Sequence, residues 1–197
     1  MTSTEPAAVT RRGQLKAQRR QQLLDAGARL IADRGFLGMR LDDLGAAVGI
    51  SGPAVYRHFP NKEALLVELL VGVSRRLLDG GKAVVASTAS SAQVLPGLID
   101  FHLDFAFGEP ELIRIQDRDL ENVPAASRRE IRRCQRQYVE VWVGVLREAH
   151  PGLAEDAARV RAHAVFGLIN STPHSAPAKT ATHARPILRD MALAALR

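Results

Sequence analysis

Arginine and lysine side chains are concentrated in the first third of this chain. Of its 197 residues, the first 62 hold 10 lysines and arginines against 5 aspartates and glutamates, whereas the remaining 135 hold 17 against 16. Guanidinium and ammonium groups bind phosphate oxygens, so a basic segment on a near-neutral body predicts an anionic partner for that segment. A solvated face with surplus arginine is the alternative on charge alone.

Patterns for catalysis and metal binding are missing from the sequence. It contains no nucleotide-binding glycine loop, no nucleophile elbow and no zinc-protease motif. Cys134 falls within the apolar period of a helix, where a buried structural thiol is a simpler interpretation than a nucleophile. The histidines beyond residue 100 show no ligand spacing on one helix face: His102, His150, His163, His174 and His183. We therefore expect no enzyme, no cofactor and no metal site.

The compartment can be inferred from what the sequence lacks. A single cysteine cannot form an intramolecular disulfide framework, which favours a reducing, cytoplasmic location. No segment approaches the roughly 18 consecutive apolar residues of a membrane span. Residues 1–10 are small and polar, without the apolar core of a signal peptide, and we expect residues 1–12 to form a disordered leader.

Apolar residues recur at helical spacing through most of the chain, and no strand-like alternation occurs. Gly35 is expected to cap the first helix in a left-handed conformation, and Asn61 to cap the fourth. The segment 80–90 is expected to be a loop or a frayed connection, and 171–178 is expected to be a loop because of its prolines and small residues. The expected helices cover residues 14–35, 41–48, 54–59, 61–78, 92–107, 110–120, 124–149, 156–171 and 186–196. The predicted fold class is all-α.

The second and third helices are predicted to form a helix-turn-helix. Gly49 supplies backbone freedom in the turn, Ser51 is a good N-cap, and Pro53 suits the first turn of the third helix. Three apolar side chains form the wedge between the two helices: Val48, Ile50 and Val55. The third helix would then present small and polar side chains to the major groove of DNA.

The run from Arg40 to Leu66 closely resembles the N-terminal signature of the TetR (tetracycline repressor) family. Its most diagnostic positions are Tyr56, Phe59, Lys62 and Leu65. The resemblance implies a helix-turn-helix DNA-binding domain at residues 13–60 and a helical ligand-binding and dimerisation domain at residues 61–197. It also implies a homodimer formed through the last two long helices, bound to a double-stranded operator.

Roles at the DNA follow from the same resemblance. It implies that Tyr56 and His58 contact the DNA backbone and that Lys62 reaches a phosphate. Ala54 and Arg57 fall on the face expected to meet base edges, where Ala54 can contact a thymine methyl group and Arg57 can bond guanine. The full expected set is Arg40, Ser51, Gly52, Pro53, Ala54, Tyr56, Arg57, His58 and Lys62.

Three positions depart from the family pattern. Met39 stands where a threonine usually caps the second helix, Gly52 replaces a frequent lysine, and Ala54 replaces a common threonine. These departures remove a hydroxyl and a potential phosphate contact, so no known operator sequence is transferred to this chain.

Polar side chains interrupt the apolar faces of the later helices. Ligand pockets combine apolar walls with a few convergent polar groups, although each such residue could instead lie at the surface. The residues expected to line an effector pocket are His102, Phe105, Gln135, Tyr138, Trp142, His163, Phe166 and Asn170. A small apolar or acyl-type effector is expected.

Two further surfaces can be inferred from side-chain patterns. Five arginines on one long helix could bind an anion, although a solvated helix face is the simpler interpretation: Arg128, Arg129, Arg132, Arg133 and Arg136. The expected dimer seam combines Val160, Ala164, Gly167, Leu168, Ile187, Met191, Ala194 and Ala195. The predicted function is a repressor released from a palindromic operator by its effector. The alternatives are a DNA-binding regulator with a protein partner or no effector, and an enzyme in the helical body.

Overall fold

The computed structural model describes residues 11–88, 90–175 and 181–197, and within these ranges it contains helices but no strands. This confirms the all-α prediction. The helices are α1 (Arg11–Gly38), α2 (Leu41–Val48), α3 (Gly52–Tyr56), α4 (Lys62–Ser87), α5 (Ser91–Gly108), α6 (Pro110–Asp119), η1 (Leu120–Asn122), α7 (Ala125–Ala149), α8 (Glu155–Ile169), α9 (Thr172–Ser175) and α10 (Ala181–Leu196). No helix of the described ranges is long and apolar enough to cross a membrane.

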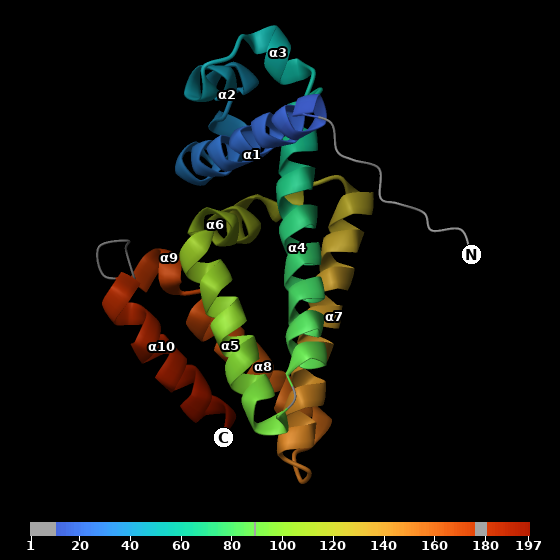
Figure 1. Cartoon of the computed structure of the whole chain (residues 1–197), viewed down its shortest axis with the longest axis vertical. Helices are drawn as coiled ribbons and strands as arrows, with labels where there is room; N and C mark the ends of the chain where they lie inside the picture. The colour runs from blue at the N-terminus through green and yellow to red at the C-terminus, as the bar shows by residue number, and fades with distance from the viewer. Residues whose placement is uncertain (1–10, 89, 176–180) are drawn as a thin grey trace, which may run out of the picture.

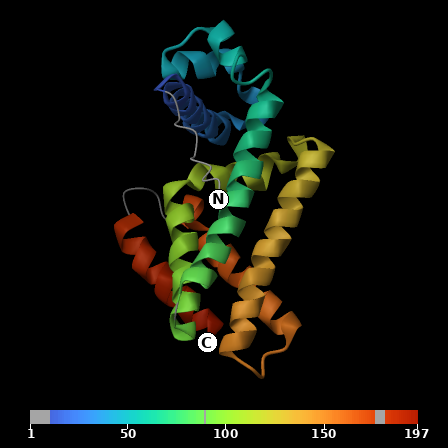
Figure 2. The same cartoon turned by 45° about the vertical axis from the view of Figure 1, so that its right-hand side comes forward.

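The described residues form two hydrophobic cores. Helices α1, α2 and α3 of the first core lie above α5, α8 and α10 of the second in Figure 1. The upper core joins α1, α2 and α3 to the first half of α4, and the lower core joins α5, α7, α8 and α10. Helix α4 runs between the two levels beside α7, as both views show (Figure 2). Helix α6 crosses beneath α1 and contributes Leu112 and Ile115 to the upper core and Ile113 to the lower one. The body and the N-terminal helices are therefore joined by shared helices.

The first helix extends beyond both of its expected ends. Arg11 and Arg12, expected in the leader, are helical, whereas residues 1–10 of that leader lie outside the described ranges. Gly35 has the positive φ expected of a cap, 78°, but its ψ of 157° is not left-handed helical, and one more turn follows. The Met39 amide closes this turn by donating to the Gly35 carbonyl at 3.2 Å, which carries Phe36 into the core.

The predicted loop or frayed connection at residues 80–90 is wrong for residues 80–87, because α4 continues to Ser87, and residue 89 lies outside the described ranges. Two neighbouring glycines suggested a break, since glycine lowers helix stability by about 1 kcal/mol relative to alanine. The two glycines are instead required for the packing of α4 against other helices. A Cβ atom built at Gly80 would lie 2.2 Å from the Phe101 ring, and one at Gly81 would lie 2.5 Å from the Tyr138 ring. The missing side chains let α5 and α7 approach the α4 backbone closely.

Other element boundaries also differ from the predictions. Helix α3 ends at Tyr56, not at residue 59, because Pro60 disfavours a helical Phe59, and Phe59 turns into the core. The predicted loop at 171–178 contains the short α9, and its last three residues lie outside the described ranges. The last helix begins at Ala181 and carries Pro186 inside it. Asn61 caps α4 as predicted, with its Oδ1 accepting from the Ala64 amide at 2.8 Å.

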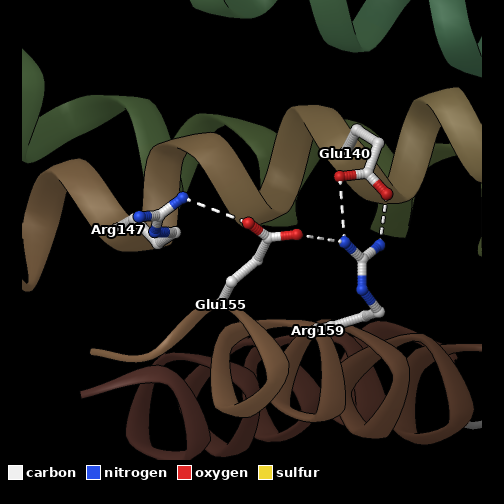
Figure 3. A network of polar contacts seen from close by, with 4 residues as sticks. All are labelled: Glu140, Arg147, Glu155 and Arg159. Atoms are coloured by element: carbon white, nitrogen blue, oxygen red, sulfur yellow. Dashed lines mark hydrogen bonds and ion pairs between the residues drawn. The ribbon is translucent and has the colours of Figure 1, made fainter.

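Ion pairs join α7 to α8 at the end of the body distant from α1 (Figure 3). Arg159 of α8 bonds Glu140 of α7, and it also donates to Glu155 at 2.9 Å. Glu155 in turn accepts from Arg147 of α7 at 3.4 Å. Exposed pairs of this kind contribute about 0–1 kcal/mol each, so the contact of α7 with α8 depends mainly on their buried apolar side chains.

We expect Gly81→Ala to lower the free energy of unfolding by about 1–3 kcal/mol, because the new methyl group collides with the buried Tyr138 ring. This cost exceeds the gain of about 1 kcal/mol that alanine brings to a helix interior. Gly144→Ala is the matched control, since its Cβ would meet no atom within 4 Å, and it should be stabilising. Urea denaturation of both variants measures the difference. Equal stabilisation by the two substitutions would contradict the close packing of α4 on α7.

Candidate functional site

The turn between α2 and α3 has the geometry that a helix-turn-helix requires. Gly49 adopts a left-handed conformation with φ 69° and ψ 36°, and the Ile50 amide donates to the Gly45 carbonyl at 3.0 Å. A Cβ at Gly45 would lie 2.8 Å from the Ile50 carbonyl oxygen and 3.2 Å from Val55. Gly45 is thus as important for the turn as Gly49. Sequence analysis missed it, although a glycine inside a short helix signals close packing.

Most of the expected DNA-binding residues lie on the surface around α3. Arg40, Ser51, Pro53, Tyr56 and Arg57 are exposed. Gly52, Ala54, His58 and Lys62 are half-buried, whereas Val55 and Phe59 are fully buried beneath them. The exposed side of α3 and of the turn after it can therefore meet a duplex without unfolding the domain.

The caps of the two short helices differ from the sequence predictions. Ser51 occupies the N-cap position of α3, but its hydroxyl makes no capping hydrogen bond. Its carbonyl oxygen accepts from the Ala54 amide instead, at 2.9 Å. The N-cap of α2 is Arg40, also without a side-chain bond, and Met39 is buried. The Ser51 hydroxyl is therefore not engaged in capping.

Lys62 is bound within the chain. Its Nζ donates to the carbonyl oxygens of Phe36 at 3.1 Å and Leu37 at 3.2 Å, and it lies 4.7 Å from the centre of the Phe36 ring. Lys62 thus satisfies the last carbonyls of α1, where a cation also meets the negative end of the helix dipole. The phosphate contact expected of Lys62 stays a prediction.

Basic residues of α1 lie beside the end of α3. Arg20 donates to the His58 carbonyl at 2.8 Å and to Glu68 at 2.7 Å, with its guanidinium 4.5 Å from the Phe59 ring centre. Arg19 donates to the Val48 carbonyl at 3.4 Å. Burial, followed by the positive charges of Arg20, Lys16 and Arg19, lowers the pKa of His58. The charge density of residues 11–20 could have identified this extension of the basic surface.

A cavity of about 220 Å³, partly open to solvent, lies in the helical body beside the middle of α4. Its walls come from α4, α5, α6, α7 and α8: Ser74, Leu77, His102, Phe105, Ile113, Gln116, Gln135, Tyr138, Val139, His163, Phe166 and Asn170. Seven of the eight residues expected to line a pocket are thus brought together. The eighth, Trp142, is fully buried behind the wall, with its ring centre 4.9 Å from that of Phe166.

His102 is the buried centre of the polar side of this cavity. Its Nε2 lies 3.1 Å from Asn170 Oδ1, and its Nδ1 lies 3.3 Å from the Tyr138 hydroxyl. Burial lowers the pKa of His102 to about 4, against a smaller opposing effect of the Asn170 bond. The ring is therefore neutral at pH 7. Nε2 donates to Asn170, and Nδ1 accepts from Tyr138. No carboxylate, lysine or arginine is among the lining residues.

Helix α6 connects this cavity to α1. Ile113 and Gln116 face the cavity, whereas Arg118 and Asp119 at the end of the helix hold the C-terminal part of α1. The Arg118 guanidinium donates to the carbonyls of Ile31 and Ala32, the latter at 3.3 Å, and it pairs with Asp119 at 3.0 Å. Asp119 is buried and accepts from the Phe36 amide at 3.3 Å. Sequence analysis did not single out either residue.

The expected dimer residues belong to α8 and α10, two helices that contact each other. Val160, Ile187 and Met191 are 67%, 58% and 50% exposed. Ala164, Gly167, Ala194 and Ala195 are also exposed, and Leu168 is half-buried.

The arginines of α7 fall into two groups. Arg128 and Arg132 pair with Glu121, Arg132 at 3.0 Å. Arg129, Arg133 and Arg136 are exposed and line a shallow surface hollow together with Arg132. Whether this group binds an anion stays a prediction, as the sequence analysis left it.

Comparison with known proteins adds evidence from sequence families. Residues 23–69 match the model of bacterial regulatory proteins of the tetR family, and residues 88–174 match that of the tetracyclin repressor-like C-terminal domain. The transcriptional repressor KstR2 of Rhodococcus jostii is 29% identical over 132 residues, which cover 66% of this chain and 65% of that repressor. The alignment thus spans just under two thirds of this relative.

Solved structures share the fold. AibR, solved in complex with isovaleryl coenzyme A and operator DNA, has a TM-score of 0.72 at 19% identity, covering 88% of this chain and 97% of AibR. FadR of Bacillus subtilis, solved with stearoyl-CoA, has a TM-score of 0.62 at 20% identity, covering 89% and 95%. Together with the two family models and the helix-turn-helix geometry, these likenesses lead to one conclusion. The chain belongs to the TetR family of bacterial regulatory proteins.

Proposed function

We propose that this protein is a cytoplasmic transcription repressor that binds a near-palindromic operator as a homodimer and is released by an apolar, acyl-type effector. One observation carries the proposal. The uncharged cavity and α1, which packs against the exposed helix-turn-helix, both contact the same helix, α6.

The exposed surface around α3 supports contact with the operator. Arg57 is exposed at the end of α3, and Ala54 is partly accessible on the helix itself, so both can reach base edges in a major groove. The cations of α1 add positive charge at one side of this surface. Binding should therefore release counterions and weaken as salt rises.

The side chains of the cavity walls favour an uncharged, apolar effector. The apolar side chains and the neutral His102 disfavour a charged group within the cavity, because burying an unpaired charge is costly. The uncharged polar side chains Gln116 and Gln135 can bond a carbonyl group. AibR and FadR were solved with acyl thioesters of coenzyme A. An acyl chain with its thioester carbonyl fits this chemistry.

Coupling between the two sites is assigned to α6. An effector that displaces Ile113 or Gln116 shifts the same helix whose Arg118 and Asp119 hold the end of α1. Because α1 contacts α6 and packs against α2 and α4, a shift of α6 moves α1 and so changes the placement of α3, the helix that would enter the major groove. Release follows if the effector binds the displaced arrangement more tightly.

The dimer is assigned to the exposed apolar face of α8 and α10. A two-fold axis through this face makes the same patch meet itself, and it covers the exposed side chains of Val160, Ile187 and Met191. A dimer presents two copies of α3 to two half-sites, which is what a palindromic operator requires.

We expect Arg57→Ala to weaken binding to the selected operator by about 1–3 kcal/mol and to relax base preference at one position per half-site. The operator is first selected from a random duplex pool, and binding is then followed by fluorescence anisotropy at several salt concentrations. Arg129→Ala is the matched control, since it removes the same charge from the distant helix α7. Equal affinity of the wild-type protein for selected and scrambled duplexes would refute the proposed function.

We expect Ala194→Glu to convert the dimer into a monomer, because the substitution enters a self-complementary interface twice and buries two like charges. Sedimentation velocity measures the assembly state, and operator binding should fall because one copy of α3 reaches only a half-site. Ala83→Glu, at an exposed position of α4, is the control and should leave the dimer intact. An Ala194→Glu protein that stays dimeric and binds DNA normally would place the interface elsewhere.

A further inference from the structure

A second hollow, a groove between α4 and α5, shares two side chains with the cavity described above. A groove of about 580 Å³ lies between α4 and α5, lined by Val73, Arg76, Leu77, Asp79, Phe101, Asp104, Phe105, Gly108 and Glu109. Leu77 of α4 and Phe105 of α5 line both the groove and the cavity. These two side chains therefore form a wall that the two spaces share.

Leu77 and Phe105 lie at the border between the two hydrophobic cores and are not fully buried in either. Both are half-buried, and each packs against the upper core as well as the lower one. A fully buried side chain would have to open a packed interior in order to move, whereas these two can turn toward the groove. The partition between cavity and groove can therefore open by a turn of two side chains that are not fully buried.

The groove combines apolar walls with charged side chains. Val73, Leu77, Phe101 and Phe105 supply the apolar walls, and Arg76, Asp79, Asp104 and Glu109 supply the charges. Arg76 pairs with Glu109 at 2.5 Å. Asp104 pairs with Arg185 at 2.7 Å. Where α5 lies closest to α4, the Phe101 ring packs directly on Gly80. Such a channel suits a hydrocarbon chain better than a polar ligand.

The volumes indicate why the groove matters. Ligand pockets typically measure about 300–1,000 Å³, and the cavity alone, at about 220 Å³, is smaller than this range. A short acyl chain can be contained within it. A long chain needs additional space, and the groove beyond Leu77 and Phe105 is the adjoining space with apolar walls.

We propose that Leu77 and Phe105 determine the chain length of the effector, because an acyl chain longer than the cavity passes between them into the α4–α5 groove. This inference rests on the proposed function, since it takes the effector to be an acyl thioester. The thioester carbonyl stays on the Gln116 and Gln135 side of the cavity, and the chain end extends past Phe105 between α4 and α5.

The test measures affinity against chain length. Saturated acyl-CoA thioesters with 4, 8, 12 and 16 carbons are titrated into the full-length protein by calorimetry. Trp142, the single tryptophan of the chain, gives a second readout by fluorescence because its ring lies against Phe166 of the cavity wall. Leu77→Phe narrows the partition, and Phe105→Ala opens it. Val139→Ala is the matched control, because Val139 lines the cavity and not the groove.

We expect Leu77→Phe to weaken binding of the 16-carbon thioester by at least about tenfold, the effect of excluding even one methylene from a hydrophobic pocket, and to leave the 4-carbon thioester within about twofold. Phe105→Ala should shift the preference toward longer chains, whereas Val139→Ala should change all chain lengths alike. Thermal unfolding verifies that each variant is folded. If Phe105→Ala does not fold, Leu77→Phe alone tests the inference.

Two results would overturn the inference, and they are distinguishable. If the wild-type protein binds acyl thioesters and Leu77→Phe leaves the dependence on chain length unchanged, the partition is wrong and the proposed function stands. If the wild-type protein binds no acyl thioester of any length, the acyl-type effector of the proposed function fails, and the partition fails with it.

Discussion

The attachment of α1 to α6 is the contact on which the rest of the structure depends. Arg118 and Asp119 satisfy backbone groups of Ile31, Ala32 and Phe36 where α1 bends at Gly35. These are charged groups, one of them buried, bonded to backbone atoms beside the bend at Gly35. Loss of either side chain would remove bonds that fix the N-terminal helices to the body.

The cavity and this attachment share α6, which contributes to both hydrophobic cores. A helix packed on both sides moves as a unit, because protein interiors are close-packed and transmit displacement. The neutral His102, bonded to Tyr138 and Asn170, keeps the polar side of the cavity ordered without placing a charge there. The geometry therefore combines an uncharged cavity with contacts that continue through α6 to α1.

Much of this arrangement could be predicted from the sequence. The helix-turn-helix depends on local signals, such as Gly49 in its left-handed turn, and these are readable without a structure. The cavity residues could be predicted because polar side chains interrupting an apolar helical period must converge when those faces pack together. Seven of eight lie around one cavity, although effector binding itself stays a prediction.

The remaining features depend on contacts between distant segments. Gly80 and Gly81 suggested a loop by their propensity, yet they lie within a helix because rings from α5 and α7 occupy the space of their side chains. Lys62 was assigned to a phosphate, whereas its nearest partners are carbonyls of α1, 25 and 26 residues earlier. Arg118 and Asp119 look like an ordinary polar helix end until α1 is placed beside them.

The most direct test of the account measures how strongly the effector and operator sites are coupled. Operator affinity is determined with and without saturating decanoyl-CoA in the wild-type protein, in Arg118→Gln, and in Arg114→Gln as a control on the same helix. The account predicts that the thioester weakens operator binding about 5–150-fold in the wild type and in Arg114→Gln, a typical allosteric coupling. In Arg118→Gln, decanoyl-CoA should still bind, but the ratio of operator affinity without decanoyl-CoA to operator affinity with it should fall toward 1. If this ratio in Arg118→Gln equals that of the wild type, α6 does not couple the two sites through Arg118.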